Sequence, residues 1–465
     1  MTRRLTRAAA LAALLAAPLA CNNGVTDTLL EAVDPDLIAP SNLRSAEGAQ
    51  AAYVGTFYRF NAALAGQNAD TVGSFLWGGL LADEWSTSST YVQNDETDAR
   101  SIQLDNTVLT RNFRALARVR TSTNQAIALL REFRPTETVK VAEMYLQRGF
   151  AELQLASDYC NGIPLSDAAG DAPVFGAPTP VAEVFAVAIA SFDSALALAG
   201  GTDAAAQRIN RAARVAKARA LLGLNRVADA AALVSATAVP TSFSYNMSFS
   251  LASQANNIWG QGVSNRRFTV GDSVEGNARN LLVRNAIPFF SARDPRVPVA
   301  YTVSANQRDT TKGQDGSIYS RTTAIYDRFT DVPVANGLDA RLIEAEARLA
   351  ANDVPGMLAI LNALRAAPPQ LGTITPAALP ALATPASRDA ALDLLFREKA
   401  FWTFSRGQRL GDLRRLVRFY GRTPETTFPV GQFYRGGQYG ADVNLPIPTD
   451  ELVNPNFTGC IDRRA

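Results

Sequence analysis

Histidine is absent from the 465-residue sequence. It is the one side chain whose ordinary pKa lies between about 5 and 8, so Ser-His-Asp and Cys-His catalysis, HExxH zinc sites and imidazole general bases all depend on it. These classes of activity are therefore excluded. Carboxylate, lysine or tyrosine chemistry remains, and so does binding without chemistry.

Motifs for metals and nucleotides are also missing. The acidic run at 95–98 lacks the spacing and central glycine of an EF-hand, which favours a solvated loop over a calcium site. Gly436 and Gly437 lack the lysine and the strand-to-helix setting of a phosphate-binding loop. We therefore expect no catalytic residue, no metal ion and no cofactor.

Charge of one sign is not in excess. The chain has 45 basic and 43 acidic residues, and removal of the first 20 residues, which include Arg3, Arg4 and Arg7, leaves 42 basic against 43 acidic. Binding to nucleic acid or to an anionic membrane surface needs a basic excess that neutralises phosphates. We therefore expect no nucleic-acid partner.

Long hydrophobic runs are absent after residue 20, where no stretch holds 18 uncharged apolar residues, so no membrane-spanning helix is predicted there. At the N-terminus, three arginines precede the short apolar run 8–17. This pattern is typical of an export signal and is too short to span a bilayer. We predict a signal peptide at 1–20.

The residue after this signal is a cysteine. Cys21 follows the small residue Ala20, which is where a lipoprotein signal places its acylated cysteine, although Pro18 stands where the usual signal has leucine. We predict that Cys21 is lipidated and that 21–40 is a tether, which would make the acyl chain the membrane attachment. The alternative is an ordinary signal peptide with Cys21 as an incidental thiol.

Only two further cysteines are present, Cys160 and Cys460. In an oxidising cell envelope they could form a disulfide. They could equally be small buried apolar residues, because sequence does not give their separation. Both alternatives stay open at this point.

Helical periodicity dominates two segments, 106–239 and 338–420. Apolar and small residues recur there at spacings of three and four, which places them on one helix face. One such stripe consists of Ala142, Tyr145, Leu146, Gly149 and Leu153. Tight turns at 223–226 and 352–353 join successive helices, as in tetratricopeptide-like pairs, without a regular 34-residue repeat.

Two other segments, 66–104 and 240–337, lack this periodicity. They are rich in glycine, serine and asparagine and contain aromatic residues. We predict exposed loops, with short strands at 267–270 and 297–303 and a helix near 277–285.

Three blocks resemble signatures of the RagB/SusD family. They are Asp-Tyr-Cys-Asn-Gly-Ile-Pro-Leu at 158–165, a helical pair at 392–415, and Asn-Leu-Pro-Ile-Pro-Thr-Asp-Glu at 444–451 followed by Asn-Pro-Asn at 454–456. With the lipoprotein-like signal they span almost the whole chain. No single block is specific, but their order and spacing together are.

The helical pair departs from the family pattern at three positions. Lys399 stands for the usual arginine, Trp402 for a glutamate and Arg406 for another glutamate, so its charge network must differ. The matching residues are Glu398, Gly407, Arg409, Asp412, Leu413, Arg414 and Arg415. We expect Glu398, Arg409 and Asp412 to pair with one another in a structural role.

The resemblance implies a mainly α fold in which tetratricopeptide-like helix pairs form a SusD-like scaffold with long inserted loops and minor strands. A single domain at 41–465 would carry its ligand site on the loops at 66–104 and 240–337. The resemblance also implies a non-catalytic outer-membrane lipoprotein, facing the outside, that captures an oligosaccharide or other polymeric nutrient. It would pass this ligand to a SusC-like TonB-dependent transporter.

Sugar recognition needs flat apolar faces together with amide or carboxylate groups that form hydrogen bonds. On that basis we predict a ligand site from the aromatic and amide residues of the two loop segments. These are Trp77, Trp85, Tyr91, Asn94, Trp259 and Tyr301. Each tryptophan taken alone is better explained as a core residue, whereas Trp85 and Tyr91 lie in a polar run where burial is harder to explain.

Two other functions remain in contention. A lipid-anchored helical-repeat scaffold of envelope assembly would share the signal and the helix pairs but would not use the aromatic loops. A secreted glycoside hydrolase would need a carboxylate pair, and Asp83 and Glu84 are the nearest suspects. Adjacent residues rarely flank one glycosidic bond from both sides, which weakens the hydrolase alternative.

Overall fold

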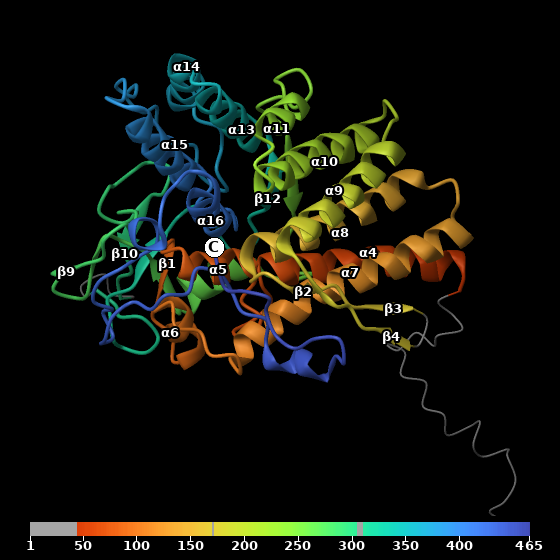
Figure 1. Cartoon of the computed structure of the whole chain (residues 1–465), viewed down its shortest axis with the longest axis horizontal. Coiled ribbons are helices and arrows are strands. Elements are labelled where there is room, and N and C mark those ends of the chain that lie inside the picture. The colour runs from red at the N-terminus through yellow and green to blue at the C-terminus, as the bar shows by residue number, and fades with distance from the viewer. Residues whose placement is uncertain (1–43, 170–171, 305–309) are drawn as a thin grey trace, which may run out of the picture.

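The computed structural model of the chain describes residues 44–169, 172–304 and 310–465. A helical scaffold occupies the upper and right-hand parts of the molecule, and a region of loops and short strands lies at the left (Figure 1). The mainly α architecture predicted from sequence is confirmed. The predicted signal peptide at 1–20, Cys21 and the tether at 21–40 lie outside the described residues.

Long helices that each pack against the next along the chain form the first part of the scaffold. They are α4 (Ala46–Leu64), α7 (Thr107–Phe133), α8 (Thr138–Asp158), α9 (Val181–Leu198) and α10 (Ala204–Gly223), followed by the short α11 (Val227–Leu233). The side chains of Asn106 and Asp203 accept hydrogen bonds from the first turns of α7 and α10, which explains where these helices begin.

Two glycines allow the close approach of these helices. A Cβ atom on Gly149 of α8 would lie 2.5 Å from the ring of Phe192 on α9. A Cβ on Gly223 at the end of α10 would lie 2.4 Å from the ring of Phe185. Larger side chains at either position would push the helices apart.

Helix α9 is the one helix in the described part of the chain that is long and apolar enough, by length and composition alone, to cross a membrane. It packs between α8 and α10 and buries Val184, Ala188 and Phe192. These contacts fit a core helix of the scaffold.

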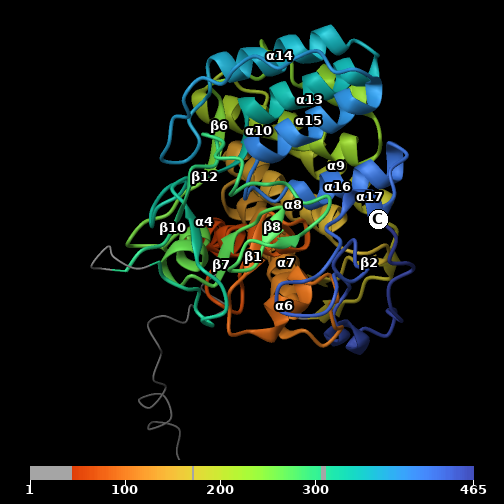
Figure 2. The same ribbon diagram turned by 90° about the vertical axis from the view of Figure 1, so that its left-hand side faces the viewer.

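A second group of helices completes the scaffold, and most of it lies at the top of Figure 1 and of Figure 2, with α16 nearer the middle of the molecule. They are α13 (Gly337–Ala350), α14 (Val354–Ala366), α15 (Arg388–Trp402) and α16 (Arg409–Phe419). Asn336 and Asp339 form a capping box at the start of α13, and Asp353 caps α14. The turn predicted at 352–353 between these two helices is confirmed.

The loop-rich region is held by antiparallel strand pairs of two to five residues. The pairs are β1 (Trp85–Thr87) with β7 (Phe268–Val270), β10 (Val299–Tyr301) with β11 (Arg321–Thr323), β6 (Ser244–Met247) with β12 (Val332–Asn336), and β8 (Val274–Glu275) with β9 (Leu281–Leu282). Outside this region, β2 (Ile163–Pro164) pairs with β5 (Pro178–Thr179) and β3 (Asp167–Ala169) with β4 (Ala172–Val174). Short helices are α5 (Ser74–Leu81), α6 (Val92–Asp98), α12 (Asn257–Trp259), the π-helix η2 (Gly260–Ser264), α17 (Pro424–Thr427) and the 3₁₀ helix η3 (Thr449–Val453).

Two local expectations differ from the structure. The segment 66–104 is not an exposed loop, because α5 and β1 are buried along their whole length. The segment 277–285 is not helical. It contains a turn and the strand β9, which pairs with β8. The strands expected at 267–270 and 297–303 are confirmed as β7 and β10.

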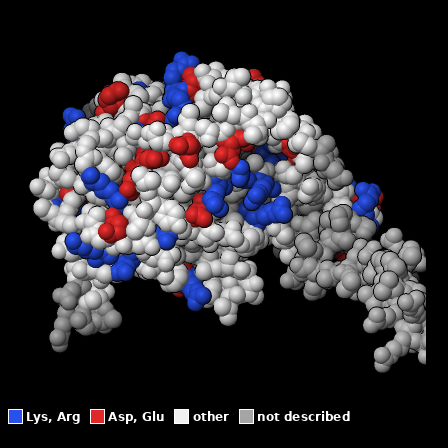
Figure 3. Space-filling model, turned by 90° about the horizontal axis from the view of Figure 1, so that it is seen from below, with Lys and Arg blue, Asp and Glu red and all other residues white. Residues whose placement is uncertain are grey.

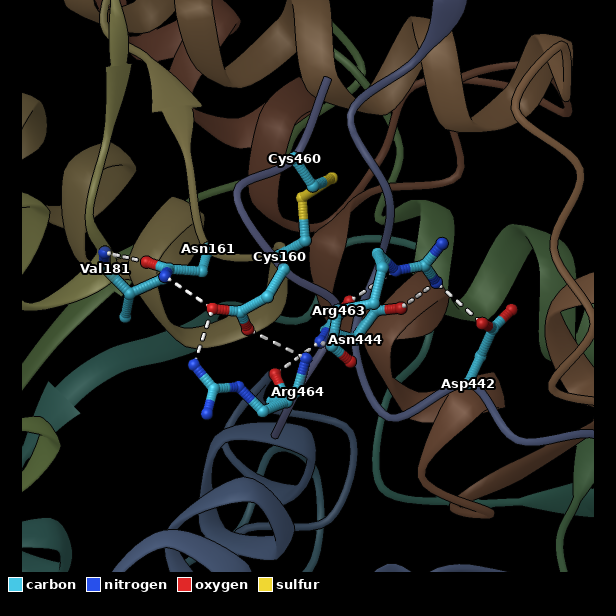
Figure 4. The surroundings of a disulfide bond; sticks show 9 residues. Cys160, Asn161, Val181, Asp442, Asn444, Cys460, Arg463 and Arg464 are labelled. Atoms are coloured by element: carbon cyan, nitrogen blue, oxygen red, sulfur yellow. Dashed lines mark hydrogen bonds and ion pairs between the residues drawn. A yellow bond between two sulfur atoms is a disulfide. The ribbon is translucent and has the colours of Figure 1, made fainter. Parts of the chain in front are cut away.

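A disulfide joins Cys160, just after α8, to Cys460 near the C-terminus (Figure 4). Hydrogen bonds hold the same two segments together: the Cys160 N–H donates to the carbonyl of Leu445 at 2.8 Å, and the amide of Asn161 donates to Asp462 at 2.9 Å. The disulfide and these hydrogen bonds therefore hold the C-terminal segment against the end of the scaffold helix α8.

Candidate functional site

The two loop segments predicted to carry the ligand site are joined by the β1–β7 pairing. Beneath it, the Arg321 guanidinium contacts both carboxylate oxygens of Glu275 at 2.9 Å, and the Ser86 hydroxyl donates to the same carboxylate at 3.0 Å. All three side chains are buried. This ion pair fixes the base of the loop-rich region.

Three of the six predicted site residues lie in the interior. Trp77, Trp85 and Asn94 have exposed fractions of 0%, 1% and 0%. The Trp85 indole N–H donates to the hydroxyl of Ser405 at 3.2 Å, and its ring packs 5.2 Å from that of Phe404. The expectation that Trp85 is exposed is therefore wrong, and a ligand at the surface of this structure does not reach these three side chains.

The other three, Tyr91, Trp259 and Tyr301, are partly exposed. The guanidinium of Arg267 lies over the ring of Tyr91, 4.9 Å from the centre of that ring. Trp259 ends α12. Within the described residues, no ring-to-ring contact joins any two of the predicted site residues. The predicted residues therefore do not form one aromatic cluster.

Tyr301 instead belongs to a group of three rings, two of which were not among the predicted site residues. Its ring centre lies 4.8 Å from that of Phe290 and 6.3 Å from that of Tyr319. We call Phe290, Tyr301 and Tyr319 the aromatic platform. Tyr319 was missed because its partner lies across the β10–β11 pair, and that register is not visible in the sequence.

The edge of the platform carries polar groups. Arg293 lies 4.4 Å from the ring centre of Phe290. The Asn277 carboxamide is fixed because it accepts from the Tyr319 N–H at 2.9 Å and donates to the Ser317 carbonyl at 2.8 Å. Tyr319 is 37% exposed. The arrangement offers a partly exposed aromatic surface beside hydrogen-bonding groups, which suits the apolar faces and hydroxyls of a sugar.

A polar groove of about 730 Å³ lies elsewhere in the loop-rich region. It is lined by hydroxyl and amide side chains, among them Thr241, Ser244, Asn246 and Thr330, with Asp331 as its charged member. It lacks a strongly exposed aromatic ring, because Phe243 is half-buried. The groove can form hydrogen bonds but has no stacking surface comparable to the platform.

Asp83 and Glu84, the carboxylates of the hydrolase alternative, are both buried, with exposed fractions of 2% and 1%. Burial raises the pKa of Glu84 to about 8 and the pKa of Asp83 well above its ordinary value. The backbone N–H of Ser405 donates to Glu84 at 3.2 Å. Neither carboxylate is placed to flank a glycosidic bond of a polysaccharide in solvent.

The raised pKa of Glu84 predicts a pH-dependent stability. The protonated side chain contributes stability that is fully present below its unfolded pKa near 4.5 and is lost as pH rises through about 8. Glu84→Gln cannot ionise, so its stability relative to the wild type should increase by roughly 4 kcal/mol between pH 5 and pH 9. Denaturant unfolding at the two pH values measures this.

The matched control for this measurement is Glu47→Gln, at an exposed position in the first turn of α4. The Glu47→Gln substitution should change the free energy of unfolding by the same amount at pH 5 and at pH 9. A pH-independent difference between Glu84→Gln and the wild type would show that Glu84 is ionised in the folded protein throughout this range.

Glu398, Arg409 and Asp412 do not pair with one another as expected. Glu398 binds the guanidinium groups of Arg296 and Arg365, each at 2.7 Å. Asp412 instead contacts Lys399 at 2.8 Å and Arg415 at 3.0 Å. Arg409 has a buried Nε without a hydrogen-bond partner.

The three family-pattern departures have structural roles. Lys399 lies between Glu346 and Asp412, and Arg406 forms a bidentate pair with Asp339 of α13, with contacts of 2.9 and 2.7 Å. The ring of Trp402 packs 4.7 Å from the Arg296 guanidinium. Within the described residues, no cluster of three or more Cys, Asp or Glu side chains has the geometry to hold a metal ion.

No protein-family model matches the chain, and no curated protein matches its sequence. Solved structures do match. A SusD-like carbohydrate-binding protein from Bacteroides fragilis aligns with a TM-score of 0.61 at 14% identity, covering 90% of this chain and 99% of that chain. A SusD superfamily protein from Bacteroides vulgatus gives 0.60 at 14%, with coverage of 90% and 99%.

A SusD superfamily protein from Bacteroides thetaiotaomicron also aligns with a TM-score of 0.60 at 14% identity, covering 90% of this chain and 100% of that chain. Because these structures match along almost their whole length, the similarity is to the entire architecture. The helical scaffold with its inserted loop-rich region is the SusD-like fold.

Proposed function

We propose that this chain is a non-catalytic nutrient-binding protein of the RagB/SusD family that captures a glycan on its loop-rich region. The observation that carries the proposal is the aromatic platform, which lies within a SusD-like fold and exposes Tyr301 and Tyr319 beside the amide of Asn277. The solved structures with this fold include proteins described as carbohydrate-binding. Tyr91 and Trp259 are further candidates for ligand contacts in the same region.

The cellular setting belongs to the same proposal. Lipidation of Cys21 would anchor the protein in the outer membrane, facing the outside, and a TonB-dependent transporter would receive the ligand. The disulfide between Cys160 and Cys460 supports an oxidising compartment, because structural disulfides persist in the cell envelope and are rare in the cytosol.

Calorimetric titration of the protein with a panel of soluble oligosaccharides tests the binding step. A Tyr301→Ala/Tyr319→Ala variant should bind its ligand about tenfold more weakly, a loss of about 1.4 kcal/mol, because truncation removes the two rings of the platform that are partly exposed. Phe175→Ala is the matched control, since Phe175 is a 40% exposed aromatic residue near β4, outside the loop-rich region. The Phe175→Ala variant should bind the same ligand with the affinity of the wild type.

Unchanged affinity in the double tyrosine variant would refute the platform as the site. Release of reducing sugar from the bound ligand would refute the non-catalytic assignment. Copurification from membranes separates the remaining alternative: recovery of a β-barrel transporter supports nutrient uptake, whereas recovery of an envelope-assembly complex supports the helical-repeat scaffold.

A further inference from the structure

A second large surface groove lies on the helical scaffold, between α4 and α7, with a volume of about 730 Å³. The two helices run side by side in the lower half of the molecule in Figure 1. None of the platform residues lines this groove. Its size falls in the range of small-molecule and oligosaccharide sites.

Arginine dominates the lining. Arg111, Arg114 and Arg118 follow one another at spacings of three and four along α7, which places them on one helix face, and Arg59 faces them from α4. The aspartates among the lining residues are Asp105 and Asp450, so the lining carries an excess of two positive charges, which Asp70 beside Arg111 reduces to one. The chain without its first 20 residues is almost neutral, so this excess is local.

Two of these arginines already have acidic partners at the rim. Arg114 contacts Asp450 of η3, and Arg111 lies 3.6 Å from Asp70. Arg59 and Arg118 are exposed and have no carboxylate partner within the described residues. Like charges at this spacing on a helix destabilise it by a few tenths of a kcal/mol each, a cost that a bound anion would offset.

The start of α7 adds to the positive potential. Thr107 and Thr110 from its first turn line the groove, and the positive end of a 27-residue helix dipole therefore lies against it. On the face of the molecule seen in Figure 3, Lys and Arg side chains gather in a dense cluster with Asp and Glu beside them, while much of that face is neutral.

An aromatic residue and hydroxyl groups accompany the arginines. Tyr58 is 42% exposed in the groove lining, and the Gln67 amide donates a hydrogen bond to its hydroxyl, which fixes the ring. Thr71, Thr107 and Thr110 supply further hydroxyls. A flat ring with fixed orientation beside hydroxyls is a surface for a sugar ring, whereas arginine is the preferred partner of carboxylate and sulfate-like oxyanions.

We propose that the α4–α7 groove binds an acidic oligosaccharide whose sugars carry carboxylate or sulfate groups. Arg59 and Arg118 would bind the anionic groups, and Tyr58 would contact a sugar face. A concave groove with one exposed ring favours a sugar chain over a flat anionic membrane. The site is separate from the aromatic platform and does not depend on glycan binding there.

Calorimetric titration with a galacturonic acid tetramer, a heparin-derived tetramer and a neutral oligosaccharide of the same length tests the groove. We expect binding of at least one acidic tetramer, weakened by added salt, and no binding of the neutral one at this site. Arg59→Gln/Arg118→Gln should weaken the binding at least tenfold. The melting temperature of this variant should equal that of the wild type, because neither side chain has an ion-pair partner among residues 44–169, 172–304 and 310–465.

Two variants serve as controls. Arg388→Gln/Arg397→Gln removes the same charge from exposed positions on α15 and should leave the affinity within twofold of the wild type. Tyr301→Ala/Tyr319→Ala should also leave it unchanged, so that failure of the groove and failure of the platform are distinguishable.

Three outcomes would overturn the proposal. The first is that neither acidic tetramer binds. The second is that Arg59→Gln/Arg118→Gln binds as tightly as the wild type. The third is that vesicles containing anionic phospholipid, or a single-stranded oligonucleotide, bind in an Arg59- and Arg118-dependent manner while the acidic tetramers do not, which would assign the groove to another class of partner.

Discussion

Glu346→Gln is expected to lower the free energy of unfolding by about 3–5 kcal/mol, the usual cost of removing one partner from a buried ion network. The Glu346 side chain of α13 is 1% exposed. It accepts from Lys399 at 2.9 Å and from the Tyr420 hydroxyl at 2.6 Å, and it pairs with Arg415. The loss would leave two buried cations with Asp412 as their remaining shared partner.

The direction of the Glu346 pKa supports this expectation. Burial alone would raise its pKa, but Arg415 and Lys399 outweigh burial and hold the pKa well below its ordinary value. A lowered folded-state pKa contributes stability that is present above the unfolded pKa and is lost as pH falls through the folded one. At pH 7 the full contribution is therefore present, and Glu346→Gln should show its full effect there.

Denaturant unfolding at pH 7 measures the loss. Glu344→Gln is the matched control on the same helix, because the Glu344 side chain is 23% exposed and its ion pair is to Arg341, at 3.1 Å. It should cost less than about 1 kcal/mol. A Glu346→Gln protein within about 1 kcal/mol of the wild type would contradict a stabilising role for the network.

The helical scaffold could be predicted because its signals are local. Stripes of small and apolar residues, tight turns and capping residues lie within one or two turns of the helix they define. The segment predicted to be helical at 338–420 holds α13 to α16, which begin at Gly337 and end at Phe419. The disulfide partners were also named, although pairing and separate burial could not be distinguished from sequence.

The loop-rich region could not be predicted in the same way because its contacts are distant in sequence. Trp85 lies in a polar run that resembles an exposed loop, yet β1 is buried because it pairs with β7, about 180 residues later. Tyr319 belongs to the aromatic platform through the register of β10 with β11. Neither pairing has a local signature in strands of three residues.

The charge network shows the same limit. Glu398, Arg409 and Asp412 lie on helices that follow each other in the sequence, which suggested that they pair with one another. Their partners come instead from other segments, such as Arg296 in the loop-rich region. The places of these charges on adjacent helices therefore did not identify their partners.

Cys160→Ala/Cys460→Ala is expected to lower the free energy of unfolding by about 2–5 kcal/mol. The disulfide closes a loop of 300 residues, and a crosslink across such a long loop restricts the unfolded chain most strongly. In the folded chain it secures the C-terminal segment, where the Asn444 amide donates to the carbonyls of Arg463 and Arg464 at 3.0 and 2.8 Å (Figure 4).

Thermal unfolding with and without a thiol reductant separates the crosslink from side-chain packing. Reductant should lower the melting temperature of the wild type to that of the double variant and should leave the double variant unchanged. Limited proteolysis should then cut the C-terminal segment sooner, because without the link to Cys460 this segment would be held to the end of α8 by hydrogen bonds such as that from Asn161 to Asp462. If reductant left the wild-type melting temperature unchanged, the disulfide would contribute no stability, and the hydrogen bonds of this segment would be sufficient to hold it.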